Sequence, residues 1–347
     1  MISALLVGNH LSASGRNPTV SEELASCFRQ TGMRVLTTSN RPNKVGRLAD
    51  MLATTLARRR SYEVAQIDLY SGPAFRWAQA VAALLTTIGK PFVISLHGGN
   101  LPHYAKRHRR RVRRLLRAAH SVTAPSGYLA REMLSLRPDI EVVPNPLDTE
   151  RYRTPKHDVA DCRIVWVRAF HHIYDPITAI AAFKQVHDRY PSATLAMYGP
   201  DLGDGSLDEC RTLAACLGLE HAVIFCGATM KSEIPRILSR SSIFLNTSRI
   251  DNAPVSIVEA MATGLPVVSS DSGGIPDLIE HGREGLLVPA GNAMLLADAV
   301  CQVIHSPTLA SELSARGRAR AHQSDWRRVL PRWMSILCEA AEHPNEP

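Results

Sequence analysis

The chain has 347 residues, 45% of them hydrophobic and 21% charged, which is typical of an ordinary globular protein and favours two domains with separate cores. Seven scattered cysteines without metal-ligand spacing exclude a disulfide framework and a structural zinc site, and no apolar run reaches the ~20 residues that cross a bilayer, so we expect a cytoplasmic protein with free thiols. The net charge is +8, but residues 1–150 alone carry +11, so the basic charge belongs to the N-terminal half.

Strands and helices alternate along this N-terminal half. Short apolar runs rich in Val and Ile predict strands at 2–7, 33–37, 92–96, 121–124 and 140–143. The segments between them predict helices at 18–31, 45–60, 74–88, 103–119 and 127–136. This order is typical of a mostly parallel sheet covered by helices on both faces. Ser126 is the predicted N-cap of the last of these helices, and Gly32 follows the end of the first.

A second alternating series follows a linker that begins at Pro144–Asp148 and continues as polar, proline-containing sequence to Asp161. Its predicted strands are 163–168, 193–198, 222–226, 242–247, 266–270 and 285–288, and one helix opens with an N-cap and proline at Asp175–Pro176. The two series predict two Rossmann-like domains of α/β class, 1–150 and 151–325, that face a cleft. We expect a last helix, within 326–347, to pack back on the first domain.

The stretch from Asp251 to Val268 is the most informative about chemistry. A predicted strand ends in polar residues at 246–248, a loop follows, and a helix begins near Pro254 to Ser256. A helix that starts after a parallel strand directs free backbone N–H groups to the carboxyl edge of the sheet, where they suit a diphosphate. Two carboxylates eight residues apart, Asp251 and Glu259, flank this start, and an acid beside a nucleotide site can accept hydrogen bonds from vicinal hydroxyls.

This stretch resembles the signature of glycosyltransferase family 4, whose members are retaining enzymes with the GT-B fold. The likeness continues through Ser269–Asp277 and Glu284–Val288, and more weakly over nearly the whole chain. It implies that Glu259 holds the ribose of a nucleotide-sugar donor and that Asp251 contacts hydroxyls of the sugar. The family usually has Glu at the first position, so the shorter Asp leaves the choice between a UDP-sugar and GDP-mannose open. Further implied donor contacts are Asn252, Val255, Ser256 and Ile257.

A cation near the diphosphate is expected at the first strand of the second domain. Arg168 ends the predicted strand 163–168 and matches the arginine of the family, whose fork binds phosphate oxygens. An exposed salt-bridge partner is the alternative interpretation of this residue. The family commonly has Lys five residues later, where this chain has Ile173, and the candidate replacements are His171, His172 and Tyr174.

Two elements of the first domain complete the resemblance. His97, in the turn Ser95–Asn100 that ends a buried strand with two glycines, resembles the family histidine that lies beside the donor sugar. A purely structural histidine is the alternative. The loop from Gly8 to Arg16 corresponds to the glycine-containing first loop of the family, and Gly15 is its implied donor contact.

The resemblance implies that a hexose-type sugar is transferred with retention, with a nucleotide-diphosphate-sugar as co-substrate and with no metal or other cofactor. A GT-B epimerase or phosphorylase is the alternative within the same fold. Eight of the twelve residues 106–117 are Lys or Arg, which predicts an anionic partner such as a membrane surface, a phosphorylated acceptor or nucleic acid, unless the run is only a solvated helix face.

The basic run has no interleaved aromatic residues, which disfavours nucleic acid. Val112, Leu115 and Leu116 lie at helical spacing and are expected to pack inward, leaving the arginines outward. We therefore expect a peripheral protein on the inner face of the cell membrane, acting on a membrane-proximal or lipid-linked glycan. A soluble acceptor is the alternative.

Overall fold

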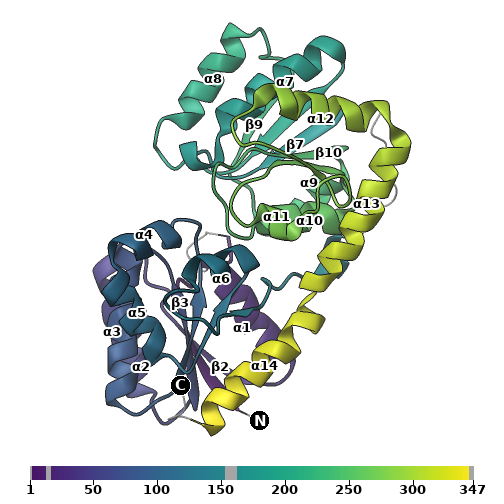
Figure 1. Cartoon of the computed structure of the whole chain (residues 1–347). Helices are drawn as coiled ribbons and strands as arrows, with labels where there is room; N and C mark the ends of the chain where they lie inside the picture. Colours follow the sequence, from purple (N-terminus) through teal and green to yellow (C-terminus); the bar gives the residue numbers. More distant parts are fainter. Residues whose placement is uncertain (1, 13–16, 153–161, 344–347) are drawn as a thin grey trace. The chain divides into compact units, whose positions relative to one another are not determined.

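The computed structural model describes residues 2–12, 17–152 and 162–343, which belong to two compact units (Figure 1). Unit 1 comprises Met1–Pro146 and Trp326–Pro347, and unit 2 comprises Leu147–Asp325. The boundary thus falls inside the segment Pro144–Asp148, and the C-terminal helix belongs to the first unit. Each unit has one six-stranded sheet whose strand pairs are parallel, which confirms the predicted α/β fold class.

Unit 1 is built on a sheet with the strand order β2-β1-β3-β4-β5-β6. Its strands are β1 (Ser3–Val7), β2 (Arg34–Thr38), β3 (Val64–Leu69), β4 (Phe92–Leu96), β5 (Ser121–Ala124) and β6 (Glu141–Val142). Its helices are α1 (Val20–Gln30), α2 (Lys44–Ala57), α3 (Pro73–Thr87), α4 (Leu101–Arg107), α5 (Arg109–Ala118), α6 (Gly127–Met133) and α14 (Trp326–Glu342). Ser126 caps α6 as predicted, since its side chain accepts a hydrogen bond from the backbone of Leu129.

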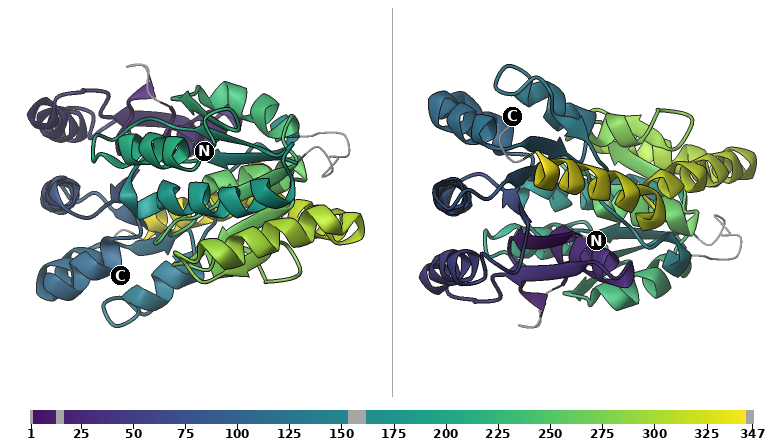
Figure 2. Two further views of the ribbon diagram at one scale, coloured as in Figure 1. Left: turned by 90° about the horizontal axis from the view of Figure 1, so that it is seen from above. Right: turned by 90° about the horizontal axis from the view of Figure 1, so that it is seen from below.

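Alternate side chains of β1 pack into two hydrophobic clusters, one on each face of the sheet. Ala4 and Leu6 pack in a cluster with α1 and α14, whereas Leu5 and Val7 pack in a cluster with α2 and α3. Helices α1 and α14 contact each other, and Figure 2 shows them on the same face. The last helix therefore completes the hydrophobic core of unit 1.

The structure of unit 1 differs from the prediction at two places. Strand β3 was not predicted, because Gln66 and Asp68 interrupt its apolar run although the whole strand is buried. The helix predicted over 103–119 is two helices, α4 and α5, because His108 between them leaves the helical conformation at φ −122° and ψ 36°.

Unit 2 has the strand order β12-β11-β10-β7-β8-β9. The strands are β7 (Arg163–Val167), β8 (Thr194–Tyr198), β9 (Val223–Gly227), β10 (Ile243–Asn246), β11 (Val267–Ser270) and β12 (Leu286–Val288). The helices are α7 (Pro176–Arg189), α8 (Ser206–Cys216), α9 (Ile234–Ser239), α10 (Val255–Thr263), α11 (Ile275–Leu278), α12 (Ala293–His305) and α13 (Pro307–Ala321). Asp175 caps α7 and Pro176 is its first residue, as predicted.

The strand order of each sheet reverses at one point, between β1 and β3 in unit 1 and between β7 and β10 in unit 2. Open α/β sheets bind ligands outside the carboxyl ends of the strands at such a switch point. The residues that follow β7 and β10, and those that follow β1 and β3, are therefore the places to look for a site.

Among the described residues, no single helix is long and apolar enough to cross a membrane. One bent pair, α12 with Pro307–Ser324, meets the length and composition limits.

Candidate functional site

An ion pair lies at the switch point of unit 2. Arg168 directly follows β7, and its guanidinium contacts the carboxylate of Asp251 in the loop after β10. The ring of Tyr174 lies 5.1 Å from the guanidinium carbon. Burial raises the pKa of Asp251 above its ordinary value, although the charge of Arg168 acts in the opposite direction. The structure thus brings two of the predicted site residues into direct contact.

Two glycines allow the backbone to pack closely around this pair. A β-carbon on Gly199, after β8, would lie 1.6 Å from the carbonyl oxygen of Arg168. A β-carbon on Gly273, after β11, would lie 2.0 Å from the carbonyl oxygen of Asp251, and Gly273 also has a φ of +60°. The N–H of Gly274 donates a hydrogen bond of 2.8 Å to the same carbonyl of Asp251. Neighbouring strand ends therefore fix both members of the ion pair through contacts that only glycine permits.

Helix α10 begins four residues after Asp251. The first N–H groups of a helix have no partner within it, and the N-cap Pro254 supplies no side-chain hydrogen bond. The hydroxyl of Ser256 is buried and has no hydrogen-bond partner among the described residues. The side chain of Ile257 packs in the core, and its N–H already donates to the carbonyl of Pro254, so only the backbone start of α10 around Val255 and Ser256 is suited to hold an anion. Asn252 is buried in the preceding loop.

Glu259 lies one turn into α10 and is 5% exposed. Its Oε1 atom accepts a hydrogen bond of 2.7 Å from the hydroxyl of Tyr152, and the Nζ atom of Lys231 lies 3.8 Å from the same oxygen. Tyr152 ends the 3₁₀ turn Thr149–Tyr152, and Lys231 begins the turn Lys231–Glu233 before α9. Neither residue was predicted. Lys231 places a cation beside the predicted ribose-binding acid. This cation comes from another part of the chain than the usual lysine of the family, whose position holds Ile173 here.

The histidines proposed to replace the missing lysine belong to a hydrogen-bonded turn. His172 Nδ1 lies 2.8 Å from Asp204 Oδ2, which also accepts a hydrogen bond from the backbone N–H of His172. Hydrogen bonds from Ser206 and His172 hold the pKa of Asp204 well below its usual range. Of the three candidate replacements, Tyr174 is the one whose ring contacts Arg168 among the described residues.

The atoms of His171, His172 and Asp204 are the one group in the described part of the chain that lies close enough together to hold a metal ion. His171 Nδ1, however, accepts a hydrogen bond from the backbone N–H of Ile173, so the neutral ring carries its proton on Nε2. Metal binding through Nε2 would require that proton to move and the Ile173 hydrogen bond to break. The donor set therefore fits a metal ion poorly.

His97 lies beside the switch point of unit 1, at the carboxyl end of β4, which is the neighbour of β3. This residue follows β4 and is 8% exposed, and its Nε2 atom lies 3.2 Å from Asp68 Oδ1 on β3. The amide of Gln66 donates a hydrogen bond of 2.8 Å to the same oxygen, and the ring of Tyr70 stacks on His97 with 5.1 Å between centroids. Burial acts to raise the pKa of Asp68, but the neighbouring His97 and the hydrogen bonds from His97 and Gln66 outweigh it, so this pKa lies below its ordinary value.

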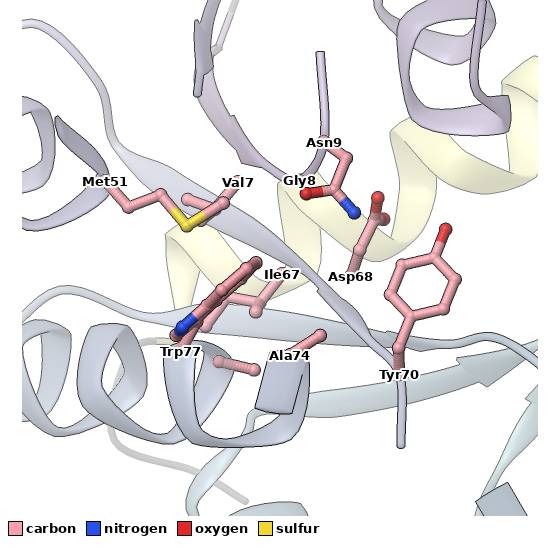
Figure 3. A pocket seen from close by; sticks show the side chains of 10 residues that line it. Val7, Gly8, Asn9, Met51, Ile67, Asp68, Tyr70, Ala74 and Trp77 are labelled. Atoms are coloured by element: carbon pink, nitrogen blue, oxygen red, sulfur yellow. The ribbon is translucent and has the colours of Figure 1, made fainter. Parts of the chain in front are cut away.

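Asp68 also lines a pocket at the carboxyl ends of β1 and β3. In Figure 3 the carboxylate lies between the side chains of Asn9 and Tyr70, with Trp77 and Met51 on the apolar side. A β-carbon on Gly8, which follows β1, would lie 2.4 Å from Asp68 Oδ2. Gly15, the predicted donor contact of the first loop, lies outside the described residues.

Two family models match the chain. Residues 11–151 match the model described as glycosyltransferase family 4, and residues 154–320 match the one described as glycosyl transferases group 1. The matches leave out only the two ends of the chain and residues 152–153.

Relatives of known name match shorter parts. A glycosyltransferase of amylovoran biosynthesis from Erwinia amylovora is 43% identical over 103 residues, which are 28% of this chain and 25% of that protein. A GDP-mannose-dependent phosphatidylinositol monomannoside mannosyltransferase of Mycobacterium tuberculosis is 25% identical over 220 residues, 58% of this chain and 55% of that protein. The chain spans about half or less of the length of these relatives.

Solved structures match nearly the whole chain in fold. The Anabaena protein HepE, solved in complex with UDP and glucose, aligns with a TM-score of 0.78 and 20% identity over 98% of this chain and 100% of that one. A sucrose-phosphate synthase from Thermosynechococcus elongatus aligns with a TM-score of 0.80 and 17% identity over 98% and 99%. At these identities the likeness establishes the fold.

Proposed function

The chain belongs to the glycosyltransferases of group 1 and family 4, and from this premise we propose that it moves a hexose-type sugar from a nucleotide-diphosphate donor to a glycan or lipid-linked acceptor. The proposed transfer retains the anomeric configuration and uses no metal or other cofactor. The acceptor hydroxyl forms the new bond on the face from which the diphosphate leaves. Its proton passes to an oxygen of the departing diphosphate.

The observation that carries this proposal is the pairing of Arg168 with Asp251 at the switch point of unit 2, next to the start of α10. An arginine fork stabilises the charge that develops on a leaving diphosphate, and a helix start adds backbone N–H donors. Both groups lie where open α/β sheets bind nucleotides. In this proposal the diphosphate binds between Arg168 and the backbone of Val255 and Ser256.

Two acids then have separate tasks. Glu259 binds the ribose hydroxyls, supported by its contacts with Tyr152 and Lys231, which restrain the carboxylate. Asp251 orients Arg168 and contacts hydroxyls of the sugar. His97 is the proposed contact of the transferred sugar from unit 1. UDP-sugars and GDP-mannose both remain candidate donors, because neither acid discriminates between bases.

The acceptor side of the proposal rests on the basic residues of 106–117, which cover the end of α4 and most of α5. In the segment 106–117, all eight Lys and Arg side chains are exposed, whereas Val112, Leu115 and Leu116 are buried as predicted. Anionic lipids attract such clusters by about 1 kcal/mol per residue near the surface. We therefore propose that this segment, called the basic segment below, docks on the inner face of the cell membrane. Relatives named for amylovoran synthesis and for a phosphatidylinositol mannoside favour an envelope glycan or lipid-linked acceptor.

A thermal-shift screen with UDP, GDP, ADP and their sugar conjugates tests donor binding. A ligand that binds only the folded state stabilises it by RT ln(1 + [L]/Kd), so at equal concentration a nucleotide that binds more tightly raises the melting temperature further. One nucleotide class should stand out. A flat response across all classes would contradict a nucleotide-sugar enzyme, and conversion of a labelled donor without acceptor would indicate an epimerase.

A further inference from the structure

Asp68 places a carboxylate in the interior of unit 1, where an ionised group is costly unless it is paired and hydrogen-bonded. Its side chain is 2% exposed, and every residue of β3 is buried. The Oδ1 atom is hydrogen-bonded to His97 and Gln66, whereas Oδ2 has no hydrogen-bond partner among the described residues. Buried ionisable groups that have a specific charged or polar partner cluster at functional sites, so this pair is a candidate for a functional role.

The hydrogen bond to Asp68 fixes how the His97 ring carries its proton. An ionised carboxylate only accepts hydrogen bonds, so the Nε2 atom that faces it at 3.2 Å must be the donor. In the neutral ring the proton then lies on Nε2, and Nδ1 carries the lone pair. Tyr70 stacks on the ring with an interplanar angle of 20°, which restricts its rotation.

We propose that Asp68 is a positioning residue for His97, which holds the imidazole as the Nε2–H tautomer so that Nδ1 accepts a hydrogen bond from a hydroxyl of the transferred sugar. This inference rests on the proposed function, because it takes His97 as a contact of the sugar. Asp68 itself does not touch the sugar in this account.

The surroundings of Asp68 are shaped to admit its carboxylate. Gly8 follows β1 at the switch point of the sheet, and a β-carbon there would lie 2.4 Å from Asp68 Oδ2 and 3.2 Å from the hydroxyl of Ser21. Any larger residue at position 8 would push the carboxylate from its place beside His97. The absence of a side chain at Gly8 therefore leaves the space that the Asp68 carboxylate occupies.

The first test is a spectroscopic reading of the His97 tautomer. The chain has 14 histidines, so the His97 signals in a ¹⁵N-histidine-labelled protein are assigned by their loss in His97→Gln. The wild-type protein should show the Nε2–H tautomer, and Asp68→Asn should show a mixture, because an amide both donates and accepts. A wild-type Nδ1–H tautomer, or an unchanged tautomer in Asp68→Asn, would overturn the inference.

The second test is kinetic. Asp68→Asn and Gly8→Ala should each lower kcat, by up to about 100-fold, which is the loss expected when a group is misplaced by about 1 Å. Gly8→Ala keeps the carboxylate, so its loss reports displacement rather than missing charge. The donor KM should change little, since the donor nucleotide is bound by unit 2. Asp50→Asn is the matched control, because Asp50 is a half-buried acid on α2 that pairs with Thr38, and it should leave kcat unchanged.

Different results would contradict the proposed role of His97 and the proposed role of Asp68. If His97→Ala transfers sugar at the wild-type rate, the proposed role of His97 is wrong and the positioning role of Asp68 falls with it. If His97→Ala is impaired but folded Asp68→Asn and Gly8→Ala keep the wild-type kcat, only the inference about Asp68 is wrong. Circular dichroism melting of each variant establishes that it is folded.

Discussion

The guanidinium of Arg168 forms an ion pair with the carboxylate of Asp251, and the two side chains are only 17% and 15% exposed. The family resemblance assigns the arginine to the diphosphate and the acid to the sugar. Their direct contact means that the two tasks are coupled, since moving either side chain changes the surroundings of the other. We expect the shorter Asp at position 251 to matter for this reason, because a Glu would carry its carboxylate one methylene farther from the backbone.

Arg168→Ala should lose roughly 2–4 kcal/mol of transition-state stabilisation, comparable to the loss of one preorganised electrostatic donor. The measurement is kcat/KM for sugar transfer. Arg163→Ala is the matched control, because Arg163 begins the same strand and is exposed. A wild-type rate in Arg168→Ala would move the role to Tyr174 or His172.

Tyr152→Phe should weaken donor binding by up to about tenfold, because the Glu259 carboxylate loses a hydrogen bond that restrains it, and such a bond to a charged group contributes roughly 1.5–3 kcal/mol. Glu259→Gln should also weaken donor binding while leaving the fold intact. A carboxylate has two acceptor oxygens for the two ribose hydroxyls, whereas the amide has only one. Isothermal titration with the nucleotide identified in the thermal screen measures both variants. Tyr62→Phe, which removes a buried tyrosine hydroxyl in unit 1, should bind donor normally. Unchanged affinity in Glu259→Gln would remove this residue from the ribose site.

The stability contributed by the Asp68 charge should depend on pH in a defined direction. Its pKa in the folded protein lies below the ordinary value of 3.8, so the unfolded chain binds the proton more readily. The contribution is therefore complete above about pH 3.8 and is lost as the pH falls through the lowered pKa. The difference in urea midpoint between wild type and Asp68→Asn should stay nearly constant from pH 7 to about pH 5 and shrink as the pH is lowered below about 3.8. A difference that grows on acidification would contradict the pairing with His97.

The basic segment should bind anionic vesicles. Even half of its eight basic residues, each worth about 1 kcal/mol near the surface, suffice for reversible docking, and the attraction falls off within about 8 Å at physiological salt. Sedimentation should show binding to anionic but not to neutral liposomes, with release at high salt and in Arg109/Arg110/Arg113/Arg114→Ser. Replacing Arg58, Arg59 and Arg60, exposed at the end of α2, by Ser is the control for total charge. Wild-type protein that stays in the supernatant with anionic vesicles at low salt would end the membrane proposal.

The sequence was most informative where apolar runs were continuous. Strands such as β4 and β10 were predicted almost to the residue, because every position in them is buried and nearly all are apolar. Strand β3 was missed because Gln66 and Asp68, which are joined by a hydrogen bond, break the same pattern. Of the two polar residues that interrupt the pattern, Asp68 is the one that pairs with His97.

Contacts between distant segments set the other limit. Arg168 and Asp251 were predicted as site residues from the family resemblance of their motifs, but their ion pair spans 83 positions and depends on strand order. Lys231 and Tyr152 carry no local signal, since a lysine before a helix and a tyrosine after a linker are ordinary. Their place beside Glu259 follows from the packing of α9 and α10 against the turn Thr149–Tyr152.

The most direct test of the central claim is sugar transfer from labelled donors by wild type and by Arg168→Ala. Purified protein is incubated with radiolabelled UDP-sugars and GDP-mannose and a lipid extract as acceptor, and both the released nucleoside diphosphate and the labelled product are measured. The account predicts that one donor class gives acceptor-dependent release with matching transfer, and that Arg168→Ala reduces it by roughly 30-fold or more, the rate equivalent of about 2 kcal/mol. Release and transfer that are equal in the two proteins, or that are absent with every donor, would contradict it.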